Sequence, residues 1–196
     1  HRAFAFHPNL SEVPEQIPET VHDLSEAFRR SSHDFDLSTW DTSRVTNMTA
    51  MFQEASGHYN LSNWNTRLVS DMQLMFAEHS SFDEDISGWD VSNVRDMSAM
   101  FRATGAFNQD ISTWAVSNVN NMEAMFANSV FAQDISIWDI RNVTNMAGMF
   151  EGNAIFNRDI TDWDVSNVTN MGAMFANSVF DQDISGWDIR NVTNMA

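Results

Sequence analysis

Hydrophobic residues recur with a fixed period along most of the chain. Successive tryptophans are 24 or 25 residues apart, and a methionine follows each of them eight residues later. A phenylalanine follows at twelve residues in every complete copy. Self-similarity at such a period is typical of repeat proteins, in which each coil buries its apolar face against its neighbours. The tryptophans are Trp40, Trp64, Trp89, Trp114, Trp138, Trp163 and Trp187.

One copy, DISGWDVSNVRDMSAMF over 85–101, gives the pattern inside a repeat. Trp89 and Val91 are two residues apart, which places their side chains on one face of an extended segment. Apolar residues over 94–101 follow at helical spacing, and Asn93 suits a helix N-cap. The predicted fold class is therefore an α/β repeat solenoid of leucine-rich-repeat-like coils, each with a short parallel β-strand and a short helix.

The repeats also divide the chain. Residues 36–196 hold seven copies, and the last one stops at Ala196 before its phenylalanine. In the region without tryptophan, Val21, Leu24 and Phe28 keep the offsets of Val45, Met48 and Phe52. We therefore expect 1–35 to be a degenerate repeat that forms an N-terminal cap, as repeat stacks require. Because the final copy is incomplete, we expect the chain to be part of a larger one.

Composition narrows the classes of partner. The formal net charge is −17, with 27 acidic residues against 10 arginines and no lysine. This charge disfavours nucleic acid and anionic membranes as partners. No segment reaches the roughly 18 apolar residues of a membrane span, so direct membrane insertion is not expected. There is no cysteine, and an acidic surface without lysine fits a secreted or a salt-adapted protein.

The recurring tryptophans and methionines each allow two interpretations. The tryptophans could form an exposed platform for sugars, but such a row would be a large apolar patch on an acidic protein. The paired methionines could bind Cu(I), yet their spacing is that of an apolar stripe, where methionine fills gaps. We therefore expect both sets to form the core.

A column of aspartates precedes the tryptophans by four residues. Each aspartate could accept the backbone N–H two residues later in an Asx-turn, which needs no ligand. The alternative is a calcium ion shared between coils, although no recognisable calcium loop is present. Apart from calcium, no cofactor is expected. The candidate metal residues are Asp85, Asp110, Asp134, Asp159 and Asp183, and Asp36 continues the column.

The positions that follow the tryptophans are candidates for ligand binding. On a strand they would face outward, and repeat proteins commonly bind partners through an extended surface. The candidate residues are Asp41, Asn65, Asp90, Asp139, Arg141, Asp164, Asp188 and Arg190. No histidine belongs to a known catalytic or zinc motif, and no position is chemically singular, so an enzyme is not expected.

The combined pattern D-I-S-x-W-D-V-S-N-V-T-N-M-x-x-M-F resembles the repeat of BspA-like surface proteins, which is also found in Mycoplasma-type lipoproteins. The resemblance covers 36–196 and implies a leucine-rich-repeat-like fold displayed on a cell surface. It implies an extracellular module for adhesion or for binding a protein or glycan on another cell or surface. The alternative function is a structural spacer or stalk, which calcium could make more rigid.

Overall fold

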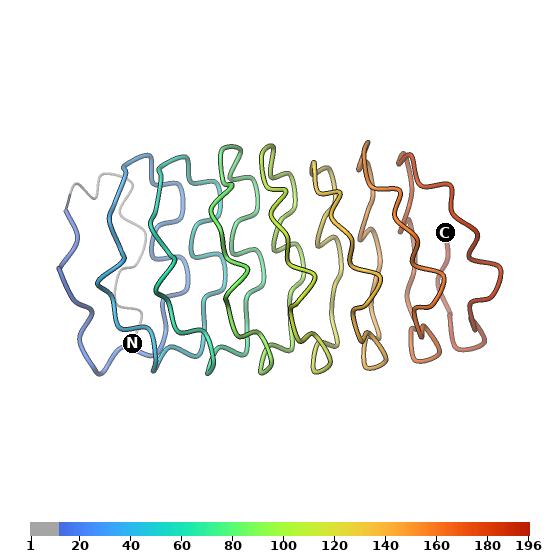
Figure 1. The fold of residues 1–196 in the computed structure, drawn as a ribbon, viewed down its shortest axis with the longest axis horizontal. Helices are drawn as coiled ribbons and strands as arrows, with labels where there is room; N and C mark the ends of the chain where they lie inside the picture. Colours follow the sequence, from blue (N-terminus) through green and yellow to red (C-terminus); the bar gives the residue numbers. More distant parts are fainter. Residues whose placement is uncertain (1–11) are drawn as a thin grey trace.

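Each repeat of the sequence forms one coil of the chain. The computed structural model describes residues 12–196, in which successive coils lie side by side from the N-terminal to the C-terminal end (Figure 1). Residues one period apart are neighbours, as in the parallel bridges that join Asp96 to Asp71 and to Asn121. No helix that could cross a membrane is present among residues 12–196.

The helix predicted over 94–101 is wrong. Ala99 and Ala103 have φ angles of 52° and 55°, which a right-handed helix does not allow. Every second N–H leaves the coil: that of Ala99 donates to Glu123 O at 2.7 Å, and that of Phe101 to Met125 O at 3.0 Å. The N–H groups between them close turns within the coil, such as Met100 N–H to Met97 O at 3.1 Å. We call this segment of each coil the turn ladder.

The strand predicted over 86–91 is wrong as well. The N–H of Trp89 donates to Ile86 O at 3.1 Å, and that of Val94 donates to Val91 O at 2.9 Å. Both bonds close β-turns of four residues, so this segment cannot offer a row of donors to the next coil. β pairing among residues 12–196 amounts to eight isolated parallel bridges.

These two findings overturn the predicted fold class. The described residues contain no helix and no extended strand, so the chain is not an α/β repeat solenoid, and the likeness to leucine-rich repeats is not supported. Apolar spacing misled the prediction because a series of turns directs residues three and four apart to the same side, as a helix does. The backbone hydrogen bonds of these turns differ from those of a helix, and the apolar pattern does not specify them.

The tryptophans and methionines form the core, as predicted. The tryptophan side chains are at most 9% exposed, and every methionine before Met195 is at most 6% exposed. Phenylalanines one period apart stack along the coils: the centroids of Phe101 and Phe126 are 5.7 Å apart with an interplanar angle of 3°. The stack begins at Phe28, whose ring lies 5.3 Å from that of Phe52.

In the segment of each coil that contains the tryptophan, polar side chains form hydrogen bonds to the neighbouring coil. Each indole Nε1 donates to a carbonyl of the preceding coil, as Trp114 does to Ile86 O at 3.3 Å. Asparagine amides do the same, for example Asn118 Nδ2 to Ser92 O at 2.7 Å. In this segment the backbone hydrogen bonds stay within each coil, and the side chains therefore supply the hydrogen bonds between coils.

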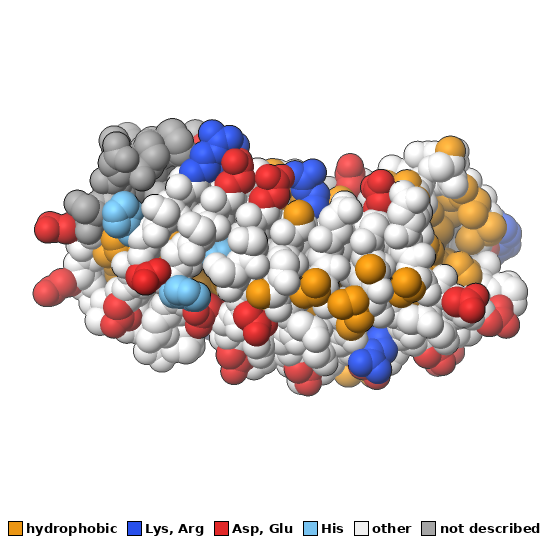
Figure 2. Space-filling model, turned by 90° about the horizontal axis from the view of Figure 1, so that it is seen from above, with side chains coloured by type: hydrophobic (Ala, Val, Ile, Leu, Met, Phe, Trp, Pro, Cys, Tyr) orange, Lys and Arg blue, Asp and Glu red, His pale blue; other side chains and the backbone are white. Residues whose placement is uncertain are grey.

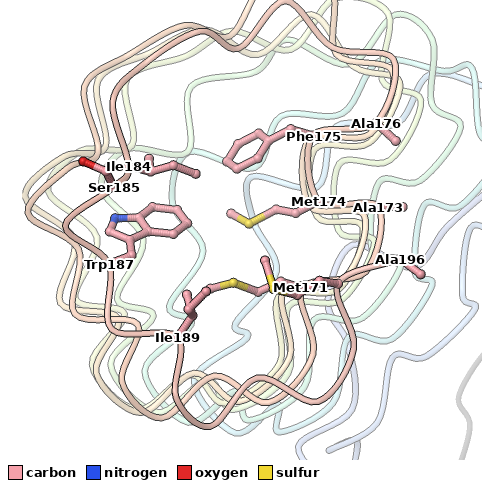
Figure 3. A pocket seen from close by; sticks show the side chains of 11 residues that line it. Met171, Ala173, Met174, Phe175, Ala176, Ile184, Ser185, Trp187, Ile189 and Ala196 are labelled. Carbon is pink, nitrogen blue, oxygen red and sulfur yellow. The ribbon is translucent and has the colours of Figure 1, made fainter.

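The two ends of the row differ. Residues 1–11 of the proposed N-terminal cap lie outside the described residues. At the other end, a hollow of 580 Å³ opens against the core (Figure 3). Met174, Phe175 and Trp187 line it, and they occupy the positions that the following coil covers elsewhere in the row. This hollow is therefore the uncovered end of the core.

Candidate functional site

The predicted surface residues lie on either side of the buried tryptophan column. We define the acidic face by two columns of the residues predicted for metal and ligand binding. The first column is exposed throughout, and the second is exposed or half-buried. Figure 2 shows acidic side chains in a row along the lower edge of the molecule. The first column is Asp85, Asp110, Asp134, Asp159 and Asp183, and the second is Asp41, Asn65, Asp90, Asp139, Asp164 and Asp188.

The first column forms Asx-turns, as expected. Asp85 Oδ1 accepts the N–H of Ser87 at 3.0 Å, and Asp110 Oδ1 accepts that of Ser112 at 2.9 Å. Hydrogen bonds from Ser87, first through its side chain and then through its backbone, lower the pKa of Asp85. These aspartates are thus ionised and held in one orientation at the surface.

The second column also forms Asx-turns, which the sequence reasoning missed. Asp90 Oδ1 accepts the N–H of Ser92 at 3.0 Å, and Asp164 Oδ1 accepts that of Ser166 at 3.1 Å. The signal was present in the sequence, because Ser or Arg stands two residues after these aspartates as Ser or Thr does in the first column. What had been predicted as outward strand positions are the acceptors of turns.

The two predicted arginines each pair with an aspartate of the same coil. Arg141 Nε donates to Asp139 Oδ1 at 2.7 Å, and an Nη of Arg190 donates to Asp188 Oδ2 at 2.6 Å. The Arg190 side chain is the main cause that lowers the pKa of Asp188 to about 2. These coils therefore present neutral ion pairs, whereas Asp90 and Asp164 present net negative charge.

Neighbouring coils bring some first-column residues together. Asp134 and Asp159 border a hollow of 480 Å³ that is also lined by Asp162 and Arg158. Hydrogen bonds from Ser136, first through its backbone and then through its side chain, lower the pKa of Asp134, and the charge of Arg158 adds to this effect while that of Asp159 opposes it. Across residues 12–196, no three His, Asp or Glu side chains are placed to hold one metal ion. The hollow is suited to ligand groups that both donate and accept hydrogen bonds.

The position before each tryptophan varies from coil to coil. Ile137 is 75% exposed at this position, where other coils carry Gly88, Thr113 or Asp162. The neighbouring framework hardly changes: the indole of Trp138 is 4% exposed and keeps its hydrogen bond to Ile111 O. The face thus combines a constant buried scaffold with an exposed column of changing chemistry.

Comparison with known proteins identifies the repeat. A family model described as Mycoplasma protein of unknown function, DUF285, matches residues 22–130 and 127–196. No curated protein and no solved structure matches the chain. The matched segments cover nearly all of the coils described above. The chain therefore belongs to the Mycoplasma-associated DUF285 family.

Proposed function

We propose that the chain is an extracellular binding module that contacts a protein or glycan through its acidic face. The observation that carries this proposal is that each coil combines constant buried residues with an exposed position that varies from coil to coil. Framework residues such as Trp138 are buried, while the adjacent Ile137 is exposed and differs from its counterparts in other coils. A spacer would need the framework but has no use for a changing outer column.

The geometry favours many weak contacts over one deep site. Each Asx-turn fixes a carboxylate at the surface, and a bond from the turn leaves further lone pairs of that carboxylate free. Such acceptors recur in every coil that carries an aspartate, so a repetitive or extended partner can engage several at once. Linked weak contacts give an overall affinity far above that of each one.

The likeness to BspA-like surface proteins supports an extracellular location and a role in adhesion. Membership of DUF285 agrees with a Mycoplasma-type surface repeat, although that family has no assigned function. The net charge of −17 makes a partner with positive charge or hydrogen-bond donors the most compatible one.

The proposal is tested with beads coated with the protein and applied to arrays of immobilised extracellular proteins and glycans. The face variant is Asp90→Asn, Asp139→Asn, Asp164→Asn and Asp188→Asn, because asparagine keeps the turn acceptor and removes the charge. The matched control removes four charges elsewhere, by Glu12→Gln, Glu15→Gln, Glu19→Gln and Glu151→Gln. We expect attachment by the wild type and the control, and its loss in the face variant. Equal attachment by all three would mean that the acidic face is not the binding surface, and attachment by none of them would favour the spacer.

A further inference from the structure

The return loops of the later coils form an uncharged belt. In each coil the return loop begins two residues after the phenylalanine of the turn ladder and ends at the next aromatic residue. In the three earlier coils it carries charges such as Arg30, Asp34 and Glu54. In four successive later coils it carries none, although the net charge of the chain is −17. These loops, which we call the neutral belt, are residues 103–107, 128–131, 152–156 and 177–180.

One position of the neutral belt carries an apolar side chain in all four coils. It directly precedes the aromatic residue that ends the loop. Ile155 is 51% exposed at this position and Val179 is 49% exposed, while the other two members are half-buried. Figure 2 shows hydrophobic side chains between the charged rows of the two edges, from the middle of the molecule towards its C-terminal end. We call these residues the apolar stripe: Ala106, Val130, Ile155 and Val179.

The apolar stripe is held in place by the coils beneath it. The phenylalanine rings that follow its members stack from coil to coil, as do Phe156 and Phe180 with centroids 6.3 Å apart. The amide of Asn153 is fully buried, and its Oδ1 accepts the N–H of Ile155 at 3.0 Å. In the next coil, Ser178 Oγ accepts the N–H of Phe180 at 3.3 Å. Because the loops are already fixed, covering the stripe costs little ordering entropy.

The surroundings of the apolar stripe favour a partner surface of the same kind. A charged group placed against the neutral belt would lose water without gaining an opposite charge, which is costly. The exposed amides of Asn108 and Asn157 border the belt, and amides both donate and accept hydrogen bonds, so they complement one another. Two copies with a net charge of −17 repel each other over most of their surfaces. The belt is a face on which they can meet without placing charge against charge.

From these observations we infer that the apolar stripe is a contact surface between two copies of this chain. A two-fold axis between Val130 and Ile155 makes the stripe self-complementary. Ala106 of one copy then faces Val179 of the other, so the smallest side chain meets a larger one, and Val130 faces Ile155. The stripe has only four side chains, whereas stable interfaces bury roughly 1,200–2,000 Å², so the dimer is weak. No residue of the acidic face belongs to the stripe, and the inference does not rest on the proposed function.

Analytical ultracentrifugation of the intact chain, from about 1 µM to 1 mM, tests the inference. We expect a reversible monomer–dimer equilibrium. The stripe variant Ile155→Asp, Val179→Asp should raise the dimer Kd at least about tenfold, because it buries carboxylates without partners. The matched control Leu68→Asp, Ile137→Asp adds the same charge at side chains that are 49% and 75% exposed outside the belt, and it should leave the Kd nearly unchanged. Added salt should strengthen the dimer, because it screens the repulsion between the acidic copies.

Several outcomes would overturn the inference. A monomer at every concentration would show that the stripe does not join two copies. A dimer that persists in the stripe variant would place the contact elsewhere, for example at the hollow of the C-terminal end. Association beyond the dimer, a dimer weakened by salt, or equal weakening by the control would each be inconsistent with a two-fold apolar contact. If circular dichroism shows that the stripe variant is unfolded, Ile155→Thr, Val179→Thr takes its place, because threonine keeps the branched shape and is less apolar.

Discussion

The imidazole of His79 meets the ring of Tyr59 edge-on, with centroids 5.9 Å apart and an interplanar angle of 88°. Both side chains are 1% exposed, and burial raises the pKa of Tyr59 to about 12. The equivalent position in the next coil holds Thr104, whose hydroxyl donates to Phe101 O at 2.7 Å. His79 is therefore a buried titratable group at a position where the next coil holds a hydroxyl that is hydrogen-bonded.

This placement predicts a loss of stability in mild acid. Burial lowers the pKa of His79 from 6.5 to about 4, and the charge of His58 acts in the same direction. In the unfolded chain, His79 takes up a proton as the pH falls through 6.5. In the folded chain, its imidazole stays neutral until the pH reaches about 4. The free energy of unfolding should thus fall by up to about 3 kcal/mol across that window. Urea unfolding at a series of pH values measures it.

His79→Thr provides the control for this prediction. Threonine reproduces the arrangement of Thr104 and cannot be protonated, so the variant should lose the dependence between pH 6.5 and 4 that belongs to His79. A variant with the same pH profile as the wild type would show that His79 is not the responsible group.

Substitutions of Trp114 separate its packing from its hydrogen bond. Trp114→Ala should cost about 3–5 kcal/mol, because it leaves a cavity between coils. Trp114→Phe should cost only about 1 kcal/mol, since Ile86 O keeps a second donor, the N–H of Trp89 at 3.1 Å. Both values come from urea unfolding, and a near-neutral Trp114→Ala would be inconsistent with a buried column.

Glycine substitutions in the turn ladder distinguish it from a helix. Ala103 is half-buried with a φ of 55°, so Ala103→Gly should raise stability by up to about 1 kcal/mol through relief of strain. Gly148 has a φ of 61°, and Gly148→Ala should lower stability by about 1 kcal/mol. In a helix interior both signs would be reversed, because glycine there costs about 1 kcal/mol relative to alanine. Thermal and urea unfolding give the signs.

Substitution of Asp110 tests whether its column serves turns or calcium. Asp110→Asn keeps the acceptor for the Ser112 N–H and should keep the wild-type melting temperature, whereas Asp110→Ala should lower it. Calcium should affect the wild type and Asp110→Asn equally. A marked rise in melting temperature with calcium that disappears in Asp110→Asn would instead support a calcium-rigidified stalk.

Sequence reasoning succeeded where apolar burial decides the structure. The spacing of Trp89, Met97 and Phe101 predicted a buried core in the correct register, and each of these residues is at most 5% exposed. The helix and strand were wrong because burial is compatible with several backbone paths. The turn ladder differs from a helix in two features. Alternate backbone N–H groups donate to the next coil, and residues such as Ala99 have positive φ although they are not glycine, so the sequence gives no sign of it.

The same reasoning located the aspartates of the acidic face. The acidic face was visible because its aspartates recur at a fixed offset from tryptophan. A repeat pattern identifies what is constant, whereas sites built from its variations need the structure.

The most direct test of the account is the affinity of the acidic face for the array partner that the wild type binds most tightly. Biolayer interferometry gives Kd for the wild type, the face variant and the matched charge control against that one partner. We predict a Kd at least about tenfold higher for the face variant, with the control unchanged, because only the former removes charges from the contact surface. Equal Kd values for the face variant and the wild type would contradict the claim that this face is the binding surface.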